Sequence, residues 1–533
     1  MIRKPLYLFY CILILLFSFF ILKNLGNIYL WQDEGKTAYL AKQILIFGYP
    51  KACDGKNLVI VENSNDFRKD NYAWRLHPWL QYYLVALSFK ITGIENAFTA
   101  RLPFAIFGIL SLLIFIKLSD ILFKNNTTTA IAATLFTFSV PLLIPIRQCR
   151  WYSLSIFFSM LIIYLYQKIL DGDKKYYGIL FGITAVLLFH SNYLMFFLLF
   201  LVLFIHFAIL VSNNKKTAEK IPWKNVIIGL FLCFLFTFPF YLYVKISDRL
   251  QFMNFTNMWK VIIYLKNYLK IVFDYFFSIY VLAIGIICWF IIKLKQHSIG
   301  NLIGKLSKDS FIGSNMKSIS LLFLITIVPI IPLAFARDYY FRYVVWMLPF
   351  GLLLMALALK SILKFNLLLG LVFIIYFTFH IPYNTDFWDL TYHLPFKNFI
   401  FELFHDYDGP IEGIVKYLNE NGNKNQTVAI NYDEFPIMFY TGMKVIVGYT
   451  GYNGKECIPD WVIMRKVNYK NKQEKMLEEY LSKYKYKKIT INYPNIQYEN
   501  REDPYMHNYR TVGNVPRVEI YKLDNSSKNK YNM

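Results

Sequence analysis

The sequence predicts a polytopic α-helical membrane protein with about eleven transmembrane helices, interfacial helices in the first outer loop and a small α/β domain at the C-terminus. Hydrophobic residues make up 56% of the chain and aromatic residues 19%, which is more apolar surface than one soluble core can enclose. Most of these residues gather in runs long enough to cross about 30 Å of hydrocarbon. From about residue 395 onward the chain is instead polar and rich in Asn, Lys, Tyr and Asp.

Eleven apolar runs predict the transmembrane helices. They fall near residues 7–30, 101–123, 128–146, 151–168, 177–189, 193–211, 225–244, 272–292, 319–336, 343–359 and 365–381. With the N-terminus in the cytoplasm, the short cytoplasmic loops hold about twice as many Lys and Arg as the opposite short loops, in agreement with the positive-inside rule. An odd number of spans then places the C-terminal region outside. We therefore expect an integral protein of a bacterial inner or plasma membrane.

The first outer loop, residues 31–100, contains two short apolar stretches. Residues 36–47 and 79–92 are short for a span and are interrupted by Lys and Gln side chains. Such stretches are typical of helices that lie in the outer membrane interface, here with Tyr82 and Tyr83 at headgroup depth.

A soluble domain outside the membrane is predicted over residues 395–533, after a membrane domain of residues 1–394. Short β-type runs occur at Thr427–Asn431, Trp461–Met464, Lys488–Asn492 and Val518–Lys522. A helical pattern at Ile411–Asn421 precedes the first run, and Gly422 follows as a stop signal.

The net charge of +23 and the six cysteines restrict function less strongly. The positive charge lies in short loops and in the C-terminal part, so it favours membrane lipids over nucleic acid as the partner. Four cysteines lie in apolar segments and are expected to be small packing residues. Cys53 and Cys457 lie in polar segments, and whether they pair is left open.

Two adjacent carboxylates, Asp33 and Glu34, follow the first apolar run within Trp31-Gln32-Asp33-Glu34-Gly35. The ordinary interpretation of such a pair is two solvated side chains at a helix end. The alternative is catalytic, because a hydroxyl that attacks an anomeric carbon gains rate from a positioned base. An interfacial carboxylate would also remain close to a lipid-borne substrate.

Arginines accumulate on the side of the membrane that carries these carboxylates. The predicted cytoplasmic flanks are almost all Lys, whereas the outer flanks hold Arg101, Arg147, Arg150, Arg337 and Arg342. Snorkelling to lipid headgroups would explain any one of them. The Lys-to-Arg asymmetry nevertheless favours anion recognition, because a guanidinium binds phosphate through a bidentate fork.

A series of five short motifs resembles the GT-C membrane glycosyltransferases of the protein O-mannosyltransferase and lipid A aminoarabinose transferase group. The motifs are Trp31-Gln32-Asp33-Glu34-Gly35, His77-Pro78-Trp79-Leu80-Gln81-Tyr82-Tyr83, Ala100-Arg101-Leu102-Pro103-Phe104-Ala105-Ile106-Phe107-Gly108, Arg147-Gln148-Cys149-Arg150-Trp151-Tyr152, and Arg342-Tyr343 through Leu348-Pro349. The series covers roughly residues 10–350. The family often has a second proline where this chain has Trp79, so the shape of that loop departs from the family pattern.

The resemblance implies a GT-C fold, a polyprenyl-phosphate-linked sugar donor, an acceptor on the outer face and inversion at the anomeric carbon. By motif match, Asp33 would be the catalytic base or acceptor-orienting carboxylate, with Glu34 beside it. Arg101 and Arg342 would bind the donor phosphate, with Arg147, Arg150 and Arg337 as further candidates. The candidate substrate-binding residues in the same motifs are His77, Tyr82, Tyr152 and Tyr343.

No cofactor is certain from the sequence. His77 or His190 could bind a divalent metal together with Asp33 or Glu34, but the chain has no spacing of the His-x-x-x-His kind. A structural role for both histidines is the simpler interpretation. The second Asp-Glu pair, at residues 433–434, precedes a helical pattern and is expected to act as a helix N-cap.

Three functions remain open at this point. The first is a glycosyltransferase that uses a polyprenyl-phosphate sugar and a lipid A, glycan or protein acceptor, with its active site on the extracytoplasmic side. The second is a lipid-linked glycan ligase or polymerase, which differs mainly in donor size. The third is a transporter or flippase of an anionic lipid, which should carry polar residues at mid-span. The crowding of charges at one predicted interface favours the enzyme.

Overall fold

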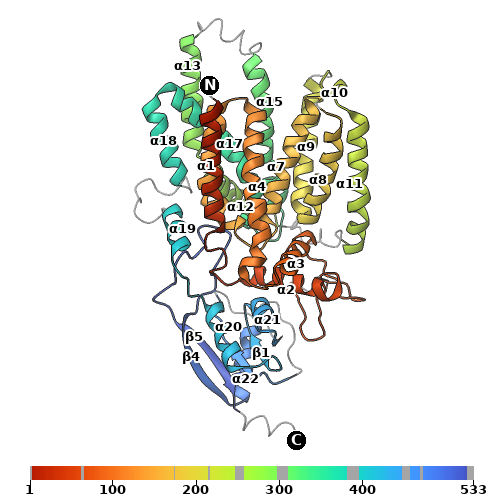
Figure 1. The fold of residues 1–533 in the computed structure, drawn as a ribbon, viewed down its shortest axis with the longest axis vertical. Helices are drawn as coiled ribbons and strands as arrows, with labels where there is room; N and C mark the ends of the chain where they lie inside the picture. The colour runs from red at the N-terminus through yellow and green to blue at the C-terminus, as the bar shows by residue number, and fades with distance from the viewer. Residues whose placement is uncertain are drawn as a thin grey trace. The chain divides into compact units, whose positions relative to one another are not determined.

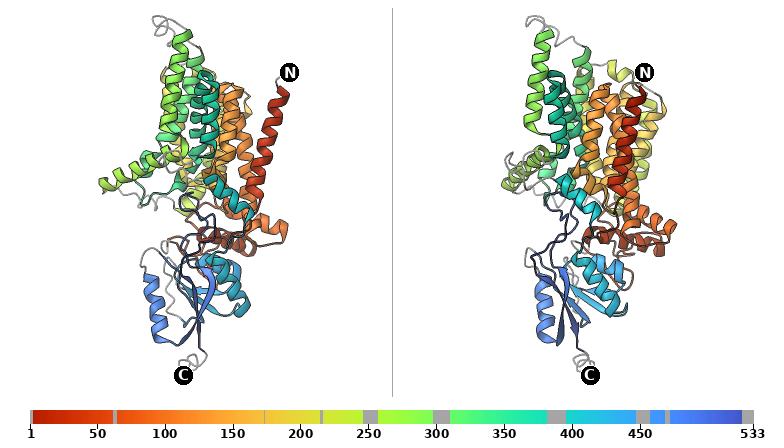
Figure 2. Two further views of the ribbon diagram at one scale, coloured as in Figure 1. Left: turned by 90° about the vertical axis from the view of Figure 1, so that its left-hand side faces the viewer. Right: turned by 60° about the vertical axis from the view of Figure 1, so that its left-hand side comes forward.

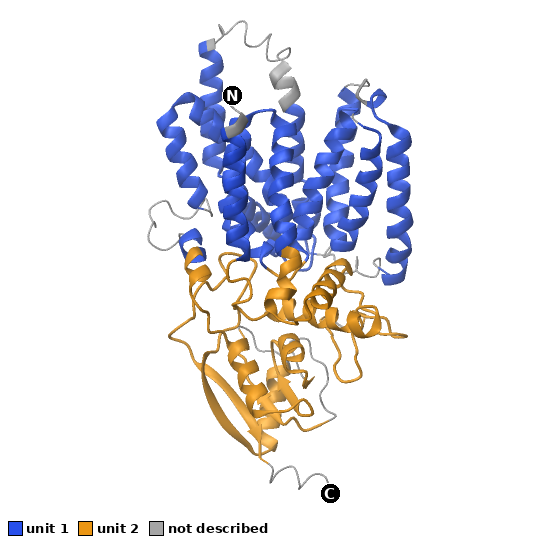
Figure 3. Cartoon of the chain, viewed as in Figure 1, with its two compact units in different colours: residues 1–22, 105–147, 151–399 blue, residues 23–104, 148–150, 400–533 orange. Residues whose placement is uncertain are grey.

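The computed structural model describes residues 3–61, 65–172, 174–213, 216–245, 257–296, 310–380, 395–446, 457–467 and 472–524, with the elements shown in Figure 1. The chain forms two compact units, coloured in Figure 3. Unit 1 comprises residues 1–22, 105–147 and 151–399, and unit 2 comprises residues 23–104, 148–150 and 400–533. The first outer loop and the C-terminal region therefore belong to the same unit. The sequence alone had assigned them to separate domains.

Unit 1 is built from long apolar helices that Figures 1 and 2 show side by side. Its elements are α1 (Arg3–Leu22), α5 (Asn126–Phe138), α6 (Val140–Ile146), α7 (Tyr152–Leu170), α8 (Tyr176–Ser191), α9 (Tyr193–Asn213), α10 (Lys216–Glu219), α11 (Trp223–Val244), α12 (Met258–Ile271), η2 (Val272–Phe276), α13 (Ile279–Gln296), α15 (Ser310–Ile327), α16 (Ile330–Ala334), η3 (Phe341–Tyr343), η4 (Val345–Met347), α17 (Leu348–Phe365) and α18 (Leu367–Phe379). Two helices belong to both units: α4 (Ala97–Phe123) begins in unit 2, and α19 (Pro395–Phe404) ends there.

Every predicted apolar run coincides with a helix or with a bent pair of helices. Among the described residues, seven helices are long and apolar enough to cross a membrane, and the number rises to nine if each of two bent pairs is one span. The bends are 56° within 126–146 and 61° within 258–295. Two shorter apolar helices, α8 and α18, correspond to the remaining predicted runs. The count of eleven spans stays a prediction.

The first predicted run is shorter in the structure than in the sequence. It was expected over 7–30, but α1 ends at Leu22, and an irregular segment separates it from the next helix. The carboxylates at 33 and 34 therefore lie on a second helix and not at the end of the first.

Close helix packing in unit 1 depends on glycine. A Cβ atom at Gly182 of α8 would lie 2.0 Å from the carbonyl oxygen of Gly229 on α11. Any side chain at either position would therefore separate the two backbones. Small residues are enriched at contacts between membrane helices because they permit this approach.

Unit 2 contains two short helices from the first outer loop, α2 (Gln32–Phe47) and α3 (Leu80–Thr92). Both are predicted to lie in the outer membrane interface, with Tyr82 and Tyr83 at headgroup depth. In the structure α2 is buried on most of its surface and the ring of Tyr82 in α3 is fully buried, while the place of these helices at the membrane interface stays a prediction. Tyr83 is 40% exposed. The burial of α2 arises because it packs against α3 and against a helix of the C-terminal region.

The C-terminal region forms an α/β fold. Its elements are α20 (Pro410–Asn421), β1 (Thr427–Ile430), α21 (Glu434–Thr441), β2 (Lys444–Ile446), β3 (Trp461–Ile463), α22 (Lys472–Lys483), β4 (Tyr486–Pro494) and β5 (Arg517–Leu523). The strand order is β2-β1-β3-β5-β4, with β2, β1 and β3 parallel and β5 antiparallel to both β3 and β4. Figure 2 shows α22 on one face of the sheet and α20 on the other.

The four predicted strands and the predicted helix are confirmed. The sequence missed β2, a three-residue strand that pairs in parallel with β1. Its core contacts are long-range, since Ile446 packs in one buried cluster with Ala429, Val462 and Leu477. So short a strand depends on its neighbours for stability, and its own sequence carries little signal.

Candidate active site

The start of α2 is a deeply enclosed polar segment of unit 2. From Trp31 to Ala41 every residue is buried except Asp33. Gly35 makes this possible, because a Cβ atom there would lie 2.6 Å from the backbone nitrogen of Pro436 in α21. The helix thus begins directly against the C-terminal α/β fold, and one carboxylate of its first turn remains accessible.

Glu34 is a fully buried carboxylate with a complete set of hydrogen bonds. Its Oε1 accepts from Arg101 Nε at 2.8 Å and from the backbone N–H of Cys149 at 2.6 Å. Its Oε2 accepts from Arg101 Nη2 at 2.7 Å and from Asn500 Nδ2 at 3.3 Å. A carboxylate offers about four acceptor positions. With all four occupied, Glu34 is suited to holding the site together and not to taking a proton from a substrate.

Arg101 directs all five of its N–H groups at protein acceptors. Besides the two bonds to Glu34, it donates to the backbone carbonyls of Leu25 at 2.9 Å, Ile28 at 2.7 Å and Tyr29 at 3.4 Å. These carbonyls belong to the irregular segment between α1 and α2. In this structure every N–H of the guanidinium thus contacts protein and fixes the start of α2, and the phosphate-binding role of Arg101 stays a prediction.

Asp33 is held between two cations and keeps an accessible face. Its side chain is 17% exposed, with Oδ1 at 3.1 Å from Lys36 Nζ and Oδ2 at 3.6 Å from Arg150 Nη2. Lys36 and Arg150 are themselves almost fully buried. A partly exposed carboxylate of this kind can accept a proton from a hydroxyl, while the adjacent cations can attract an anion.

Lys36 is a site residue that the sequence analysis passed over. It appeared there only as a charge that interrupts an apolar stretch. Because Lys36 follows Asp33 by three residues in a helix, the two side chains lie on one face. This spacing could have predicted their ion pair from the sequence. The Lys36 ammonium also lies 5.8 Å from the ring centroid of Phe435.

The C-terminal region contributes two further side chains to this centre. Asn500 donates to Glu34, and its backbone carbonyl accepts from Gln148 Nε2 at 3.0 Å. The guanidinium of Arg501 lies 4.6 Å from the ring centroid of Trp31 and 4.0 Å from that of Tyr498. Nothing in the local sequence around residue 500 indicates the contacts with Glu34, Gln148 and Trp31, because these span more than 350 positions along the chain.

A buried ionic cluster supports this edge of the sheet. Asp433 follows β1 and lies 2.9 Å from Arg465, which follows β3. The carboxyl ends of neighbouring parallel strands meet at one edge, so residues after β1 and β3 come together. Burial raises the pKa of Asp433 to about 6, although Arg465 and Arg501 oppose the shift. Burial likewise raises the pKa of Glu499 to about 8, again against Arg465.

Asp433 occupies the expected N-cap position of α21, but its side chain does not make the expected capping hydrogen bond. The φ of Asp433 is +70°. The carboxylate pairs with Arg465 instead. A capping geometry needs an extended backbone at this position, and the left-handed conformation prevents it.

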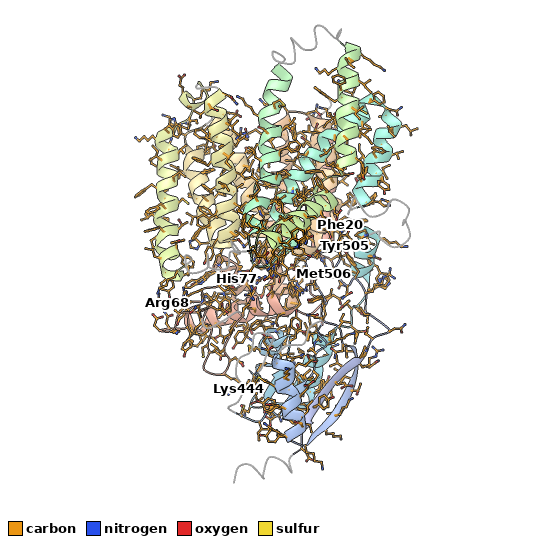
Figure 4. The ribbon with its side chains drawn as sticks, turned by 180° about the vertical axis from the view of Figure 1, so that it is seen from behind. Phe20, Arg68, His77, Lys444, Tyr505 and Met506 are labelled. Atoms are coloured by element: carbon orange, nitrogen blue, oxygen red, sulfur yellow. The ribbon has the colours of Figure 1, made fainter. Side chains whose placement is uncertain are left out.

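Two of the predicted substrate-binding residues, His77 and Tyr82, lie in unit 2. The His77 ring, labelled in Figure 4, stacks with Trp74 at a centroid distance of 6.4 Å. Tyr82 is wholly buried in α3. Both roles stay predictions.

The remaining predicted residues belong to unit 1. Arg147 donates to the carbonyls of Phe20 at 2.7 Å and Ile21 at 3.0 Å, so it binds the end of α1. Arg337 is 62% exposed and lies 3.8 Å from Asp338. The Arg342 guanidinium lies over two aromatic rings, 4.2 Å from the centroid of Tyr340 and 5.8 Å from that of Tyr343. Tyr152 is buried at the start of α7.

The described residues contain no group of three His, Cys, Asp or Glu side chains arranged to hold a metal ion. His190 faces the carbonyl of Phe236 at 3.3 Å within unit 1. The six cysteines are all free, so Cys53 and Cys457 form no disulfide in this structure.

Comparisons with known proteins agree with the motif series. Residues 76–240 match the family model described as dolichyl-phosphate-mannose-protein mannosyltransferase. No curated protein matches the sequence.

Solved structures match over nearly the whole chain. ArnT from Cupriavidus metallidurans in the apo state superposes with a TM-score of 0.54 at 11% identity and covers 97% of both chains. The same protein bound to undecaprenyl phosphate gives 0.54 at 10% identity, over 98% of this chain and 99% of that chain. The archaeal oligosaccharyltransferase AglB from Archaeoglobus fulgidus, in complex with an inhibitory peptide and a dolichol-phosphate, gives 0.54 at 12% identity, over 87% of this chain and 69% of that chain.

Proposed function

We propose that this chain, which has the GT-C fold, is an integral membrane glycosyltransferase. It transfers a sugar from a polyprenyl-phosphate carrier to an acceptor hydroxyl or amine on the outer face of the membrane, with inversion at the anomeric carbon. The proposal places the enzyme in a bacterial inner or plasma membrane, with unit 2 outside the cytoplasm.

The observation that carries the proposal is the exposure of Asp33 within a buried helix start. A displacement at an anomeric carbon needs a carboxylate near the nucleophile and positive charge near the departing phosphate. Asp33 meets the first requirement because its side chain is the accessible one of the two carboxylates. Lys36 and Arg150, which flank it, supply positive charge within 4 Å.

The residues then divide into two groups by their contacts. Asp33 takes the proton of the acceptor, or orients its lone pair, as the bond to the anomeric carbon forms. The donor phosphate leaves with the electron pair of the broken bond and needs little protonation. Glu34 and Arg101 hold the first turn of α2, since their polar atoms are already paired with protein.

The donor class is supported by two of the structural relatives. ArnT was solved with undecaprenyl phosphate, and AglB with a dolichol-phosphate. For this chain we propose a polyprenyl-phosphate-linked sugar, with a lipid, glycan or protein as acceptor. Arg150, which lies beside Asp33, and Arg342, which lies over two tyrosine rings, are separate candidates for the phosphate contact.

The test is direct transfer by the purified protein in nanodiscs. A radiolabelled sugar on polyprenyl phosphate is supplied together with an extract of envelope glycolipids and glycoproteins, and products are identified by mass spectrometry. We expect labelled product and free polyprenyl phosphate in equal amounts, with the opposite anomeric configuration to the donor. Movement of intact donor between leaflets without bond cleavage would identify a flippase, and transfer restricted to long glycans would identify a ligase.

A further inference from the structure

Asn500, in the C-terminal region, contacts the buried carboxylate of the first turn of α2. Its Nδ2 donates to Glu34 Oε2 at 3.3 Å, and its backbone carbonyl accepts from Gln148 Nε2 at 3.0 Å. The Oδ1 atom lies 3.3 Å from the same Gln148 Nε2. One amide thus connects three segments of unit 2 that are far apart in the sequence.

We propose that Asn500 is a positioning residue of the transfer reaction. It holds Glu34 in one orientation, and Glu34 in turn fixes the neighbouring Asp33 in the first turn of α2. The proposal rests on the proposed function of Asp33. The proposal makes the C-terminal region part of the active centre. Without the contact from Asn500, one acceptor position of Glu34 would lack its hydrogen bond.

The polarity of the amide is determined by its neighbours. Glu34 can only accept, so the group facing it must be a donor. Gln148 Nε2 can only donate, so the group facing it must be an acceptor. An asparagine satisfies both at once, and an aspartate at the same place would present an acceptor to the carboxylate.

The position of Asn500 is itself fixed by both chain neighbours. Glu499 accepts from the backbone N–H of Ile411 at 3.0 Å and so binds the first turn of α20. Arg501 lies over the rings of Trp31 and Tyr498. The amide is therefore presented from a segment that is anchored on either side. A rigid support of this kind keeps a reacting group within the sub-ångström tolerance that efficient catalysis needs.

The experiment compares Asn500→Ala and Asn500→Asp with the wild-type full-length protein in nanodiscs. Loss of a hydrogen bond to a charged group predicts that kcat falls about 10- to 100-fold in Asn500→Ala, with the KM for donor changed little. Asn500→Asp should be as impaired or worse above pH 7. It should recover toward wild-type as the pH falls, because a protonated carboxyl can donate to Glu34 where a carboxylate cannot.

Asn421→Asp is the matched control. It is the same substitution at the exposed end of α20, where the side chain binds only the carbonyl of Tyr417 in the hydrogen bonds of the structure. Its activity relative to wild-type should not change with pH. Unchanged kcat in Asn500→Ala overturns the proposal, and so does a deficit in Asn500→Asp that is the same at every pH.

A second measurement does not depend on activity. Thermal unfolding is recorded for Glu34→Gln, Asn500→Asp and the double variant, which exchanges amide and carboxylate between the two positions. If the contact is as described, the double variant is more stable than the sum of the two single losses predicts. Additive losses would refute the contact. A wild-type protein that transfers no sugar but shows this coupling would instead refute the proposed function while leaving the contact established.

Discussion

Arg101 and Glu34, which are 67 positions apart in the sequence, form a bidentate ion pair whose side chains are 3% and 0% exposed. Both N···O distances are below 3 Å, at 2.8 Å and 2.7 Å. The pair joins the beginning of α4 to the beginning of α2. Because Arg101 also binds three carbonyls of the intervening segment, it determines the path of the chain into the helix that carries Asp33.

Removal of this guanidinium should destabilise unit 2. Truncation of one partner of a buried ion pair typically costs about 3–5 kcal/mol, so we expect Arg101→Met to lower the free energy of unfolding by that amount. Arg101→Lys keeps the charge but loses the fork geometry, and should cost about 2 kcal/mol. Denaturant unfolding in detergent measures both. Arg68→Lys, at an exposed pair with Asp70, is the control and should change stability by less than about 0.5 kcal/mol.

The proposed catalytic role of Asp33 can be separated from the proposed structural role of Glu34. We expect Asp33→Asn to lower kcat by about 10² to 10⁴, as is typical for loss of a general base, with donor binding close to wild-type. Its loss of stability should be smaller than that of Glu34→Gln, because Asp33 is partly exposed and its ion pairs are longer, at 3.1 Å and 3.6 Å. Glu34→Gln should instead lower stability as well as activity, because it leaves the buried Arg101 with a neutral partner. Turnover near the wild-type value in purified Asp33→Asn protein would move the base to another residue.

The role of Arg342 can be tested by its response to lysine. A phosphate contact through a bidentate fork cannot be reproduced by a point charge, so Arg342→Lys should weaken donor use at least tenfold, about 1.4 kcal/mol. A titration of polyprenyl-phosphate sugar against the purified variant gives this number. Arg337→Lys serves as the comparison, since that side chain is 62% exposed. If transfer by the wild-type, Arg342→Lys and Arg337→Lys proteins depends equally on donor concentration, Arg342 does not bind the phosphate. Arg150 is then the next candidate for this contact.

The stability of unit 2 should depend on pH through Glu499. Burial raises the pKa of this carboxyl from its ordinary value of 4.5 to about 8, so the folded state keeps a proton that the unfolded chain has released. The corresponding stabilisation is complete below about pH 4.5 and is lost as the pH rises through about 8. The Asp433 carboxyl contributes in the same direction: its stabilisation is complete below about pH 4 and is lost as the pH rises through about 6.

Thermal unfolding between pH 5 and pH 9 measures this effect. We expect the midpoint to fall with rising pH in the wild-type and to vary less in Glu499→Gln, which keeps an acceptor for the N–H of Ile411. Glu479→Gln changes a carboxylate that is 68% exposed and should leave the slope unaltered. An identical slope in Glu499→Gln would assign the pH dependence to other groups.

A reporter assay can test the orientation of the protein in the membrane. Eleven spans after a cytoplasmic N-terminus place residues 395–533 outside, so a reporter that is active only in the cytoplasm should be silent when fused after Met533. The same reporter fused between α9 and α11 is expected to be active and controls for expression. Activity at the C-terminus would mean that the span count is wrong by an odd number.

The sequence by itself determined the fold class and most of its elements. Apolar runs of membrane length and alternating β-type runs are local patterns, and each has a direct physical cause in burial and backbone geometry. They located most of the long helices of unit 1, though not α12, and the strands β1, β3, β4 and β5. The five motifs also singled out Asp33, Glu34, Arg101 and Arg150, which the structure brings together in unit 2.

Only the tertiary structure shows which partners each of these side chains contacts. Whether an arginine binds phosphate or a neighbouring carboxylate depends on which acceptors surround its N–H groups, and for Arg101 those are Glu34 and three backbone carbonyls. The grouping of the first outer loop with the C-terminal region and the contact of Asn500 with Glu34 were equally hidden. Such contacts join residues hundreds of positions apart, and a single sequence records the residues but not the distances between them.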